Sequence, residues 1–190
     1  MNLYQDAILP FVPGEFRVKP ASEAWEHHGH YSLRREIFCT EQGVFIGDDR
    51  DAIDDEARRI VALSCIAGAG DQVVGVVRIH EPEPGLWWGS RLGVHSQFRR
   101  IGSIGAELVQ LAVCTATEQG CHTFLAHVQT QNVPFFRLLH WSSEEEIVLH
   151  GRPHHRMRAD LAHYAPRGQA PHGQDFRRFL RPRRDIRLAA

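Results

Sequence analysis

The sequence predicts an α+β domain in which helices flank a mixed, mostly antiparallel sheet, giving three α/β/α layers. Three consecutive strand-like runs, residues 60–67, 73–80 and 86–94, are separated by Gly- and Pro-containing connectors, a pattern typical of an antiparallel meander. The last run leads through a Gly-containing turn into helical periodicity up to residue 118, and a further strand follows at 121–129. Because a strand–helix–strand connection joins parallel neighbours, the sheet is predicted to be mixed.

Before the meander, the chain predicts one strand and one helix. Residues 15–19 alternate as a strand. Ser22, followed by acidic residues at 23 and 26, predicts a helix start that is favoured by the helix dipole. We expect that helix to end near Gly43.

After the strand at 121–129, the sequence predicts a short helix and a hairpin. Residues 132–139 form the helix, with Pro134 tolerated in its first turn. Residues 145–150 and 155–161 form the hairpin, around a turn at 151–153. From residue 162 the chain is rich in Pro, Gly and Arg, so we expect a domain at 1–161 and a flexible tail or truncated linker at 162–190.

Composition and charge restrict the class of protein. A chain of 190 residues with 43% hydrophobic content and no transmembrane-length run predicts one domain in the cytoplasm, with no membrane partner. The four cysteines form no CxxC pair, which favours free, buried thiols. A net charge of −1 argues against a nucleic-acid partner, although residues 36–56 are acidic and residues 167–187 are rich in arginine.

The stretch around residues 92–108 reads as a strand, an anion-binding loop and a helix. The glycines Gly102 and Gly105 allow close backbone approach to a ligand, and the first N–H groups of the helix have no partners within it. Arg99 and Arg100 add positive charge. These features suit a phosphate or pyrophosphate group, and the plainer alternative is an ordinary strand-to-helix turn.

The order of elements from about residue 16 to residue 161 resembles the GNAT superfamily of acetyl-CoA-dependent N-acyltransferases. Residues 99–105, RRIGSIG, are similar to its pyrophosphate loop, Arg/Gln-x-x-Gly-x-Gly/Ala, in either of two registers. The resemblance implies that acetyl-CoA, as co-substrate, is bound by the main chain of the preceding strand, by the loop and by a later Asn-containing segment. The implied residues are Leu92, Val94, Arg99, Arg100, Gly102, Ser103, Gly105, Asn132 and Phe136.

Within this superfamily, the chain is most similar to the GNAT proteins of bacterial nitrilase gene clusters, which are linked to nitrogen starvation. Residues 35–44, 125–129 and 150–155 carry that similarity. Phe136 stands where many members have a tyrosine that acts as general acid, and a phenyl ring cannot donate a proton.

The resemblance implies direct transfer of the acetyl group to a small amine or amino-acid-like metabolite. The candidates for the base are Glu41, His80 and His127, and the plainer alternative for each is a solvated carboxylate or a hydrogen-bonded histidine. In the acidic stretch, Asp48 and Asp51 are the candidates for attracting a cationic amine. Histidines cluster at 27–30 and at 150–155, but Gly151 and Pro153 break the helix that the second spacing would need, and no partnering Cys or acid pattern appears, so we expect no metal.

Two other functions are left open by the sequence. One is a non-catalytic module that binds or senses acyl-CoA, because the usual tyrosine is missing and the loop match is imperfect. The other is an enzyme similar to acyl-homoserine-lactone synthases, suggested by Glu41 and Gln42. A homodimer is also left open.

Overall fold

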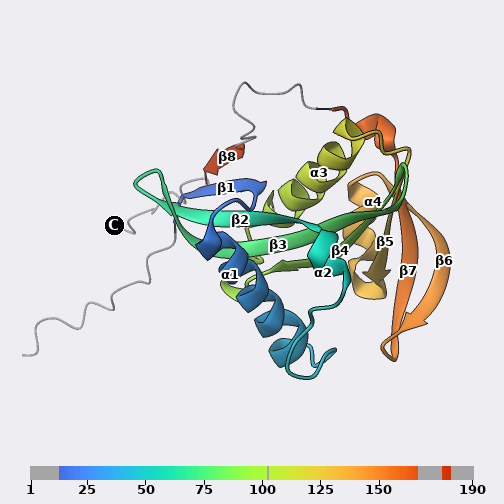
Figure 1. The fold of residues 1–190 in the computed structure, drawn as a ribbon, viewed down its shortest axis with the longest axis horizontal. Coiled ribbons are helices and arrows are strands. Elements are labelled where there is room, and N and C mark those ends of the chain that lie inside the picture. Colours follow the sequence, from blue (N-terminus) through green and yellow to red (C-terminus); the bar gives the residue numbers. More distant parts are fainter. Residues whose placement is uncertain (1–12, 102, 167–176, 181–190) are drawn as a thin grey trace, which may run out of the picture.

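An eight-stranded sheet runs through the computed structural model, in the order β6-β7-β5-β4-β3-β2-β1-β8 (Figure 1). The structure describes residues 13–101 and 103–166 and the backbone of residues 177–180. The strands are β1 (Glu15–Pro20), β2 (Arg58–Ile66), β3 (Ala69–Glu83), β4 (Leu86–Val94), β5 (Thr123–Gln129), β6 (Trp141–Leu149), β7 (Arg152–Ala159) and β8 (Arg177–Leu180). The β4–β5 pair is parallel, and every other neighbouring pair of described strands is antiparallel. The predicted mixed, mostly antiparallel sheet is therefore confirmed.

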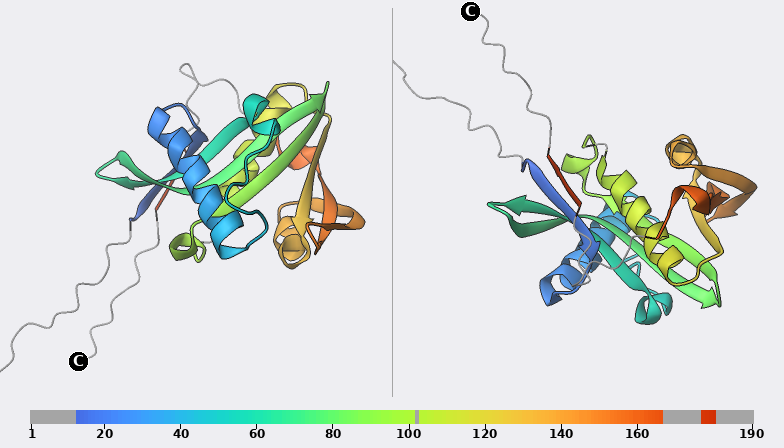
Figure 2. Two further views of the ribbon diagram at one scale, coloured as in Figure 1. Left: turned by 60° about the horizontal axis from the view of Figure 1, so that its bottom comes forward. Right: turned by 90° about the horizontal axis from the view of Figure 1, so that it is seen from above.

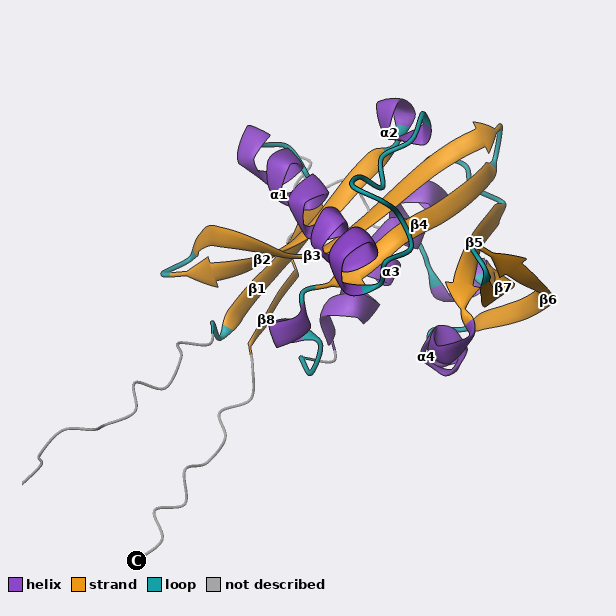
Figure 3. Cartoon of the chain, turned by 90° about the horizontal axis from the view of Figure 1, so that it is seen from below, coloured by secondary structure: helices purple, strands orange, loops and turns teal. Residues whose placement is uncertain are grey.

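Helices cover both faces of this sheet, as the three-layer prediction requires. Figure 2 shows the two long helices on opposite faces. The helical segments are α1 (Ala24–Arg34), the π-helix η1 (Arg35–Glu41), α2 (Ile53–Glu56), η2 (Ser96–Phe98), α3 (Ser103–Glu118), η3 (Thr130–Asn132), α4 (Val133–Leu138) and η4 (Leu161–His163). In Figure 3, the loop that follows η1 crosses the same face of the sheet as α1 and leads to α2.

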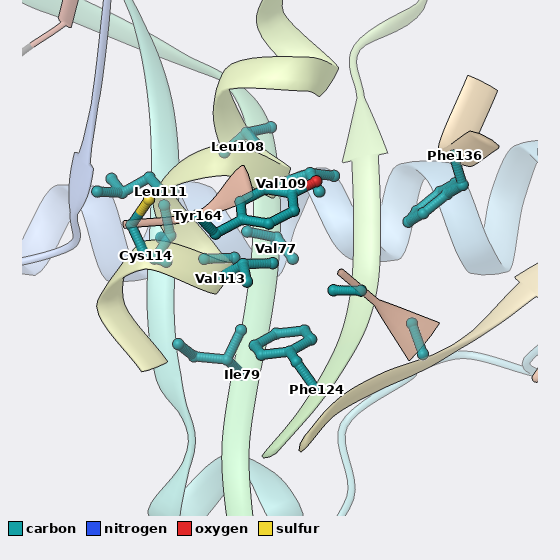
Figure 4. Packing of buried hydrophobic residues seen from close by; sticks show 14 of the residues in the cluster. Val77, Ile79, Leu108, Val109, Leu111, Val113, Cys114, Phe124, Phe136 and Tyr164 are labelled. Carbon is teal, nitrogen blue, oxygen red and sulfur yellow. The ribbon is translucent and has the colours of Figure 1, made fainter. Parts of the chain in front are cut away.

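The larger core lies between α3 and the sheet. The helical period predicted for this segment is present, since Leu108, Val109, Ala112 and Ala116 are all buried. Figure 4 shows side chains of α3 and β3 packed together in this layer. A second, smaller apolar cluster lies on the α1 face and includes Leu33 of α1.

Several helices and strands begin or end at residues other than those predicted. The helix from α1 does reach the region of Gly43, but its last seven residues are wound as the π-helix η1. Strand β3 runs on to Glu83, so the connector expected between the strands 73–80 and 86–94 is shorter. Strand β6 begins at Trp141 and β7 at Arg152, because cross-strand pairing extends the predicted hairpin in both strands.

Described residues beyond position 161 are attached to the domain. Tyr164 is buried, and its hydroxyl accepts a hydrogen bond from Trp141 Nε1 at 3.0 Å and donates one to the Leu139 carbonyl. Strand β8 pairs with β1. The division at residue 161 remains a prediction, and the rest of the segment expected as a tail lies outside the described residues.

The described residues also bear on the cysteine and membrane predictions. All four cysteines are free, and three of them are buried, as predicted. No helix within the described part of the chain is long and apolar enough to cross a membrane.

Candidate active site

The neighbouring strands β4 and β5 separate partway along their length. They pair only from Leu86 with Thr123 to Gly89 with Ala126, although β4 continues to Val94 and β5 to Gln129. The carboxyl-terminal halves of the two strands therefore leave an opening in the middle of the sheet, with unpaired β4 backbone along one side.

A bulge in β4 marks the start of this opening. The register between β3 and β4 shifts by one residue between Ser90 and Gly93, and Arg91 has a φ of 56°. Beyond the bulge, the His95 N–H donates to the Val74 carbonyl on β3 at 2.9 Å. Because main-chain groups alternate along a strand, the N–H of Val94 faces the opening instead.

A cavity of about 510 Å³ lies at the opening. Its wall includes Val109 and Ala112 of α3 on one face of the sheet and Phe38 of η1 on the other, so the cavity passes through the sheet between β4 and β5. The α3 side is apolar, with Phe124, Phe136 and Trp141 completing it. The opposite side carries most of the polar wall residues, which include Gln42, Asp51, Arg78, His80, Arg91, His127, Gln129, His150 and His154. The predicted residue Leu92 also lines this cavity.

The predicted anion-binding loop adjoins this opening. Helix α3 begins at Ser103, which places Ser103 and Gly105 in its first turn, and Gly102 lies outside the described residues. Arg99 Nε donates to the carbonyl of Val94 at 2.9 Å, and its Nη2 donates to Glu41. Arg100 is exposed. The loop therefore presents two arginines beside a helix N-terminus, whereas Glu41, a predicted base, lies outside the cavity wall and is paired to Arg99.

The predicted Asn-containing segment supplies another wall of the cavity. Asn132 and Phe136 both line it. Phe136 is buried, with its ring centroid 5.1 Å from that of Trp141 and 5.6 Å from that of Phe135, both in edge-to-face geometry. The side chain at this position is thus fixed by aromatic packing and carries no proton to donate.

The other two predicted bases, His80 and His127, do line the cavity. Burial lowers the pKa of His80, helped by the charge of Arg78. Burial also lowers the pKa of His127, followed by the charges of His154 and Arg156. Both imidazoles are therefore held in the neutral form that can accept a proton.

His154 lines the site although the sequence pattern assigned it no catalytic role. In the sequence it belongs to the segment 150–155, which carries the family similarity and was considered for metal binding. Strand pairing places it opposite Gln129 of β5, on the same sheet face as His127, and it lines the cavity. The register of β7 on β5 brings His154 to the cavity, and no local sequence pattern predicts that register. Among the described residues no group of three or more His, Cys, Asp and Glu side chains is placed to hold a metal ion.

Both predicted substrate-binding residues of the acidic loop, Asp48 and Asp51, form ion pairs with arginines. Asp48 Oδ2 lies 2.7 Å from Arg50 Nη2, outside the cavity wall. Asp51 lines the cavity and accepts hydrogen bonds from Arg78 at 2.6 Å and from Arg91 at 3.2 Å. Attraction of a cationic amine by these carboxylates stays a prediction, and it would have to act against the charge of these guanidinium groups.

A buried ion network, which the sequence did not predict, lies behind Asp51. Arg34 and Asp49 have side chains at 0% exposure, and Arg34 donates to both Asp49 and Asp54. Burial opposes ionisation of Asp54, but hydrogen bonds from Arg34 and the Asp51 N–H, together with the charge of Arg78, outweigh it and lower the Asp54 pKa. The acidic run therefore neutralises buried arginines beneath the cavity.

Comparison with known proteins shows the family and the fold of this chain. A sequence model described as the acetyltransferase (GNAT) family matches residues 16–141. A Bacillus subtilis (strain 168) protein named uncharacterized N-acetyltransferase YjcF is 28% identical over 132 residues, which covers 68% of this chain and 89% of YjcF.

Two solved structures share the fold. An acyl-CoA N-acyltransferase from Pseudomonas aeruginosa superposes with a TM-score of 0.62 at 20% identity, covering 76% of this chain and 97% of the other. Escherichia coli ElaA gives the same TM-score at 18% identity, covering 76% and 98%. Because the family match covers well over half of the chain, from β1 through the loop to β5 and α4, the chain belongs to the GNAT family of acetyltransferases, enzymes that use acetyl-CoA or another acyl-CoA.

Proposed function

We propose that the protein is an acetyl-CoA-dependent N-acetyltransferase that transfers the acetyl group directly to a small amine or amino-acid-like metabolite. The observation that carries this proposal is the cavity that passes through the sheet where β4 and β5 separate. Such a passage lets a donor from one side and an acceptor from the other meet at the middle of the sheet, as direct transfer requires.

The residues around the opening fit an acyl-CoA. The free β4 edge at Val94 offers a main-chain N–H to an amide or thioester carbonyl. Arg99, Arg100 and the first turn of α3 offer positive charge and main-chain N–H groups to a diphosphate. When bound, the acyl-CoA supplies an acyl group activated as a thioester, and the protein supplies position and a polarising environment.

The acceptor side of the cavity suits a small molecule. Its volume of about 510 Å³ lies in the range of ordinary small-molecule pockets. Asp51 is the carboxylate in the described wall, and two arginines hold it. Apart from Asp51 and its two arginines, the wall is made of aliphatic, aromatic, amide and histidine side chains with one serine, which favours a compact acceptor with few charges over a polycation.

We propose further that the protein acts in the cytoplasm and in nitrogen metabolism. The support is the similarity of residues 35–44, 125–129 and 150–155 to GNAT proteins of nitrilase gene clusters. A homodimer is compatible with this role.

Thermal-shift titration with acetyl-CoA, CoA and S-adenosylmethionine tests this proposal, together with thiol release across a panel of L-amino acids, alkylamines and arylalkylamines. We expect acetyl-CoA and CoA to raise the melting temperature and at least one amine to release CoA. Binding without thiol release would favour the acyl-CoA-sensing alternative. Stabilisation by S-adenosylmethionine would favour the homoserine-lactone alternative, and no stabilisation by CoA species would overturn the proposal.

A further inference from the structure

The ring of His154 is held in one tautomer by its own strand. Its Nδ1 atom lies 2.9 Å from the carbonyl oxygen of Arg152. A carbonyl oxygen can only accept a hydrogen bond, so Nδ1 carries the proton. In the neutral ring, Nε2 then keeps its lone pair and is the atom able to accept a proton.

The position of His154 places its ring in the wall of the site. The residue is 9% exposed and lines the cavity, and it lies on the same sheet face as Gln129 and His127. Among the described residues, no hydrogen bond occupies its Nε2. The titratable and charged groups around it are His127 of β5, Glu145 of β6, Arg152 and Arg156 of β7, and His150 of the β6–β7 turn.

We propose that Nε2 of His154 takes the proton from the acceptor amine during acyl transfer, an inference that rests on the function proposed above. The amine nitrogen forms a bond to the acyl carbon, and the bond between that carbon and sulfur breaks with its electron pair left on sulfur. The amine proton moves to Nε2 of His154. It then passes through water to the thiolate, so that CoA leaves as the thiol and His154 returns to its neutral form.

The other candidate bases lack this arrangement. Glu41 lies outside the cavity wall, paired to Arg99. Nδ1 of His80 is buried and has no hydrogen-bond partner, so no contact fixes its tautomer. The ring of His127 packs on Trp88 at a centroid distance of 4.7 Å, and no hydrogen bond of its nitrogens is found among the described residues. His154 alone among these candidates in the described wall combines a fixed tautomer with a free ring nitrogen.

The sharpest test is the His154→Asn variant. The asparagine amide can replace the Nδ1–H donor to the Arg152 carbonyl, but it has no atom equivalent to Nε2. With the best acceptor from the amine panel, we expect kcat/KM to fall about 100-fold or more, the range for loss of a general base. We expect calorimetric affinity for acetyl-CoA to stay within about threefold, and the acid limb of the kcat/KM profile against pH to disappear.

A matched control is His155→Asn, on the opposite face of the same strand, where Nδ1 lies 2.7 Å from Ser143 Oγ. We expect this variant to keep kcat/KM within about threefold. In a His154→Ala variant, added imidazole should restore part of the lost rate, which a merely structural role would not allow. Wild-type kcat/KM in His154→Asn, or no imidazole rescue, would overturn the assignment. A wild-type protein that binds no acetyl-CoA would instead overturn the proposed function itself.

Discussion

The Nε atom of Arg91 donates a hydrogen bond to Oδ2 of Asp49 at 2.8 Å. Arg91 occupies the β4 bulge with a φ of 56°, and Asp49 belongs to the acidic loop 42 residues away in sequence. The same carboxylate oxygen accepts a bond from Arg34 of α1 at 2.9 Å. Asp49 therefore joins the helix, the loop and the bulged strand at the edge of the cavity.

This relationship predicts that Asp49→Asn is strongly destabilising. Removing one partner from a buried ion network leaves charge uncompensated, which costs about 3–5 kcal/mol. Asp48→Asn is the matched control, because Asp48 is only partly buried and its pair with Arg50 is exposed. Urea denaturation of both variants would measure the difference, and equal free energies of unfolding would contradict the structural role given to Asp49.

Stability should fall in acid partly through His30. Burial lowers the pKa of His30 to about 3, helped by the charge of Arg34 and opposed by a hydrogen bond to the Val77 carbonyl. The unfolded chain takes up this proton near pH 6.5 and the folded chain does not. The contribution of neutral His30 to the free energy of unfolding is therefore fully present above pH 6.5. It is lost as the pH falls toward 3, at up to about 1.4 kcal/mol per pH unit.

The matched variants are His30→Gln and His28→Gln, the second at an exposed position of the same helix. Denaturation midpoints between pH 7 and 4 should depend less on pH in His30→Gln than in the wild type, whatever its absolute stability. His28→Gln should follow the wild-type slope. An unchanged slope in His30→Gln would show that this imidazole does not titrate as its burial requires.

The Arg99–Glu41 pair predicts opposite effects of two substitutions on donor binding. Arg99→Ala removes a charge-assisted contact to the diphosphate and should weaken acetyl-CoA binding about tenfold. Glu41→Gln removes the carboxylate that competes for Arg99, so affinity should rise and kcat should stay within about threefold.

Calorimetry at two salt concentrations would measure both effects, with Arg58→Ala on the distant strand β2 as a control for net charge. Equal affinities in the Arg99 and Arg58 variants would contradict a role for Arg99 in the loop. A 100-fold loss of kcat in Glu41→Gln would make Glu41 the base in place of His154.

Local patterns were sufficient to predict most of the fold. The meander, the loop and helix α3 follow from turn residues and apolar periodicity, which depend only on near neighbours in the chain. Local patterns together with the family resemblance also predicted residues that line the opening, such as Leu92 and Asn132.

The remaining features depend on contacts between distant segments. The pairs of Arg34 with Asp49 and of Arg91 with Asp49 join residues 15 and 42 positions apart, so the acidic stretch by itself does not reveal that it neutralises buried arginines. His154 reaches the site only through the register of β7 on β5. The π-helix η1 has the apolar spacing of an ordinary helix, and its widened turn has no local signature.

The central claim is that the first turn of α3 and the adjoining opening hold an acyl-CoA. A Cβ at Gly105 would lie 3.4 Å from Phe135 Cζ, an ordinary contact, so Gly105→Ala and Gly105→Asp should both fold. Calorimetric titration with acetyl-CoA should show one-to-one binding for the wild type and Gly105→Ala. In Gly105→Asp, the added negative charge should abolish binding. Wild-type affinity in a folded Gly105→Asp variant, or no binding by the wild type, would contradict the claim.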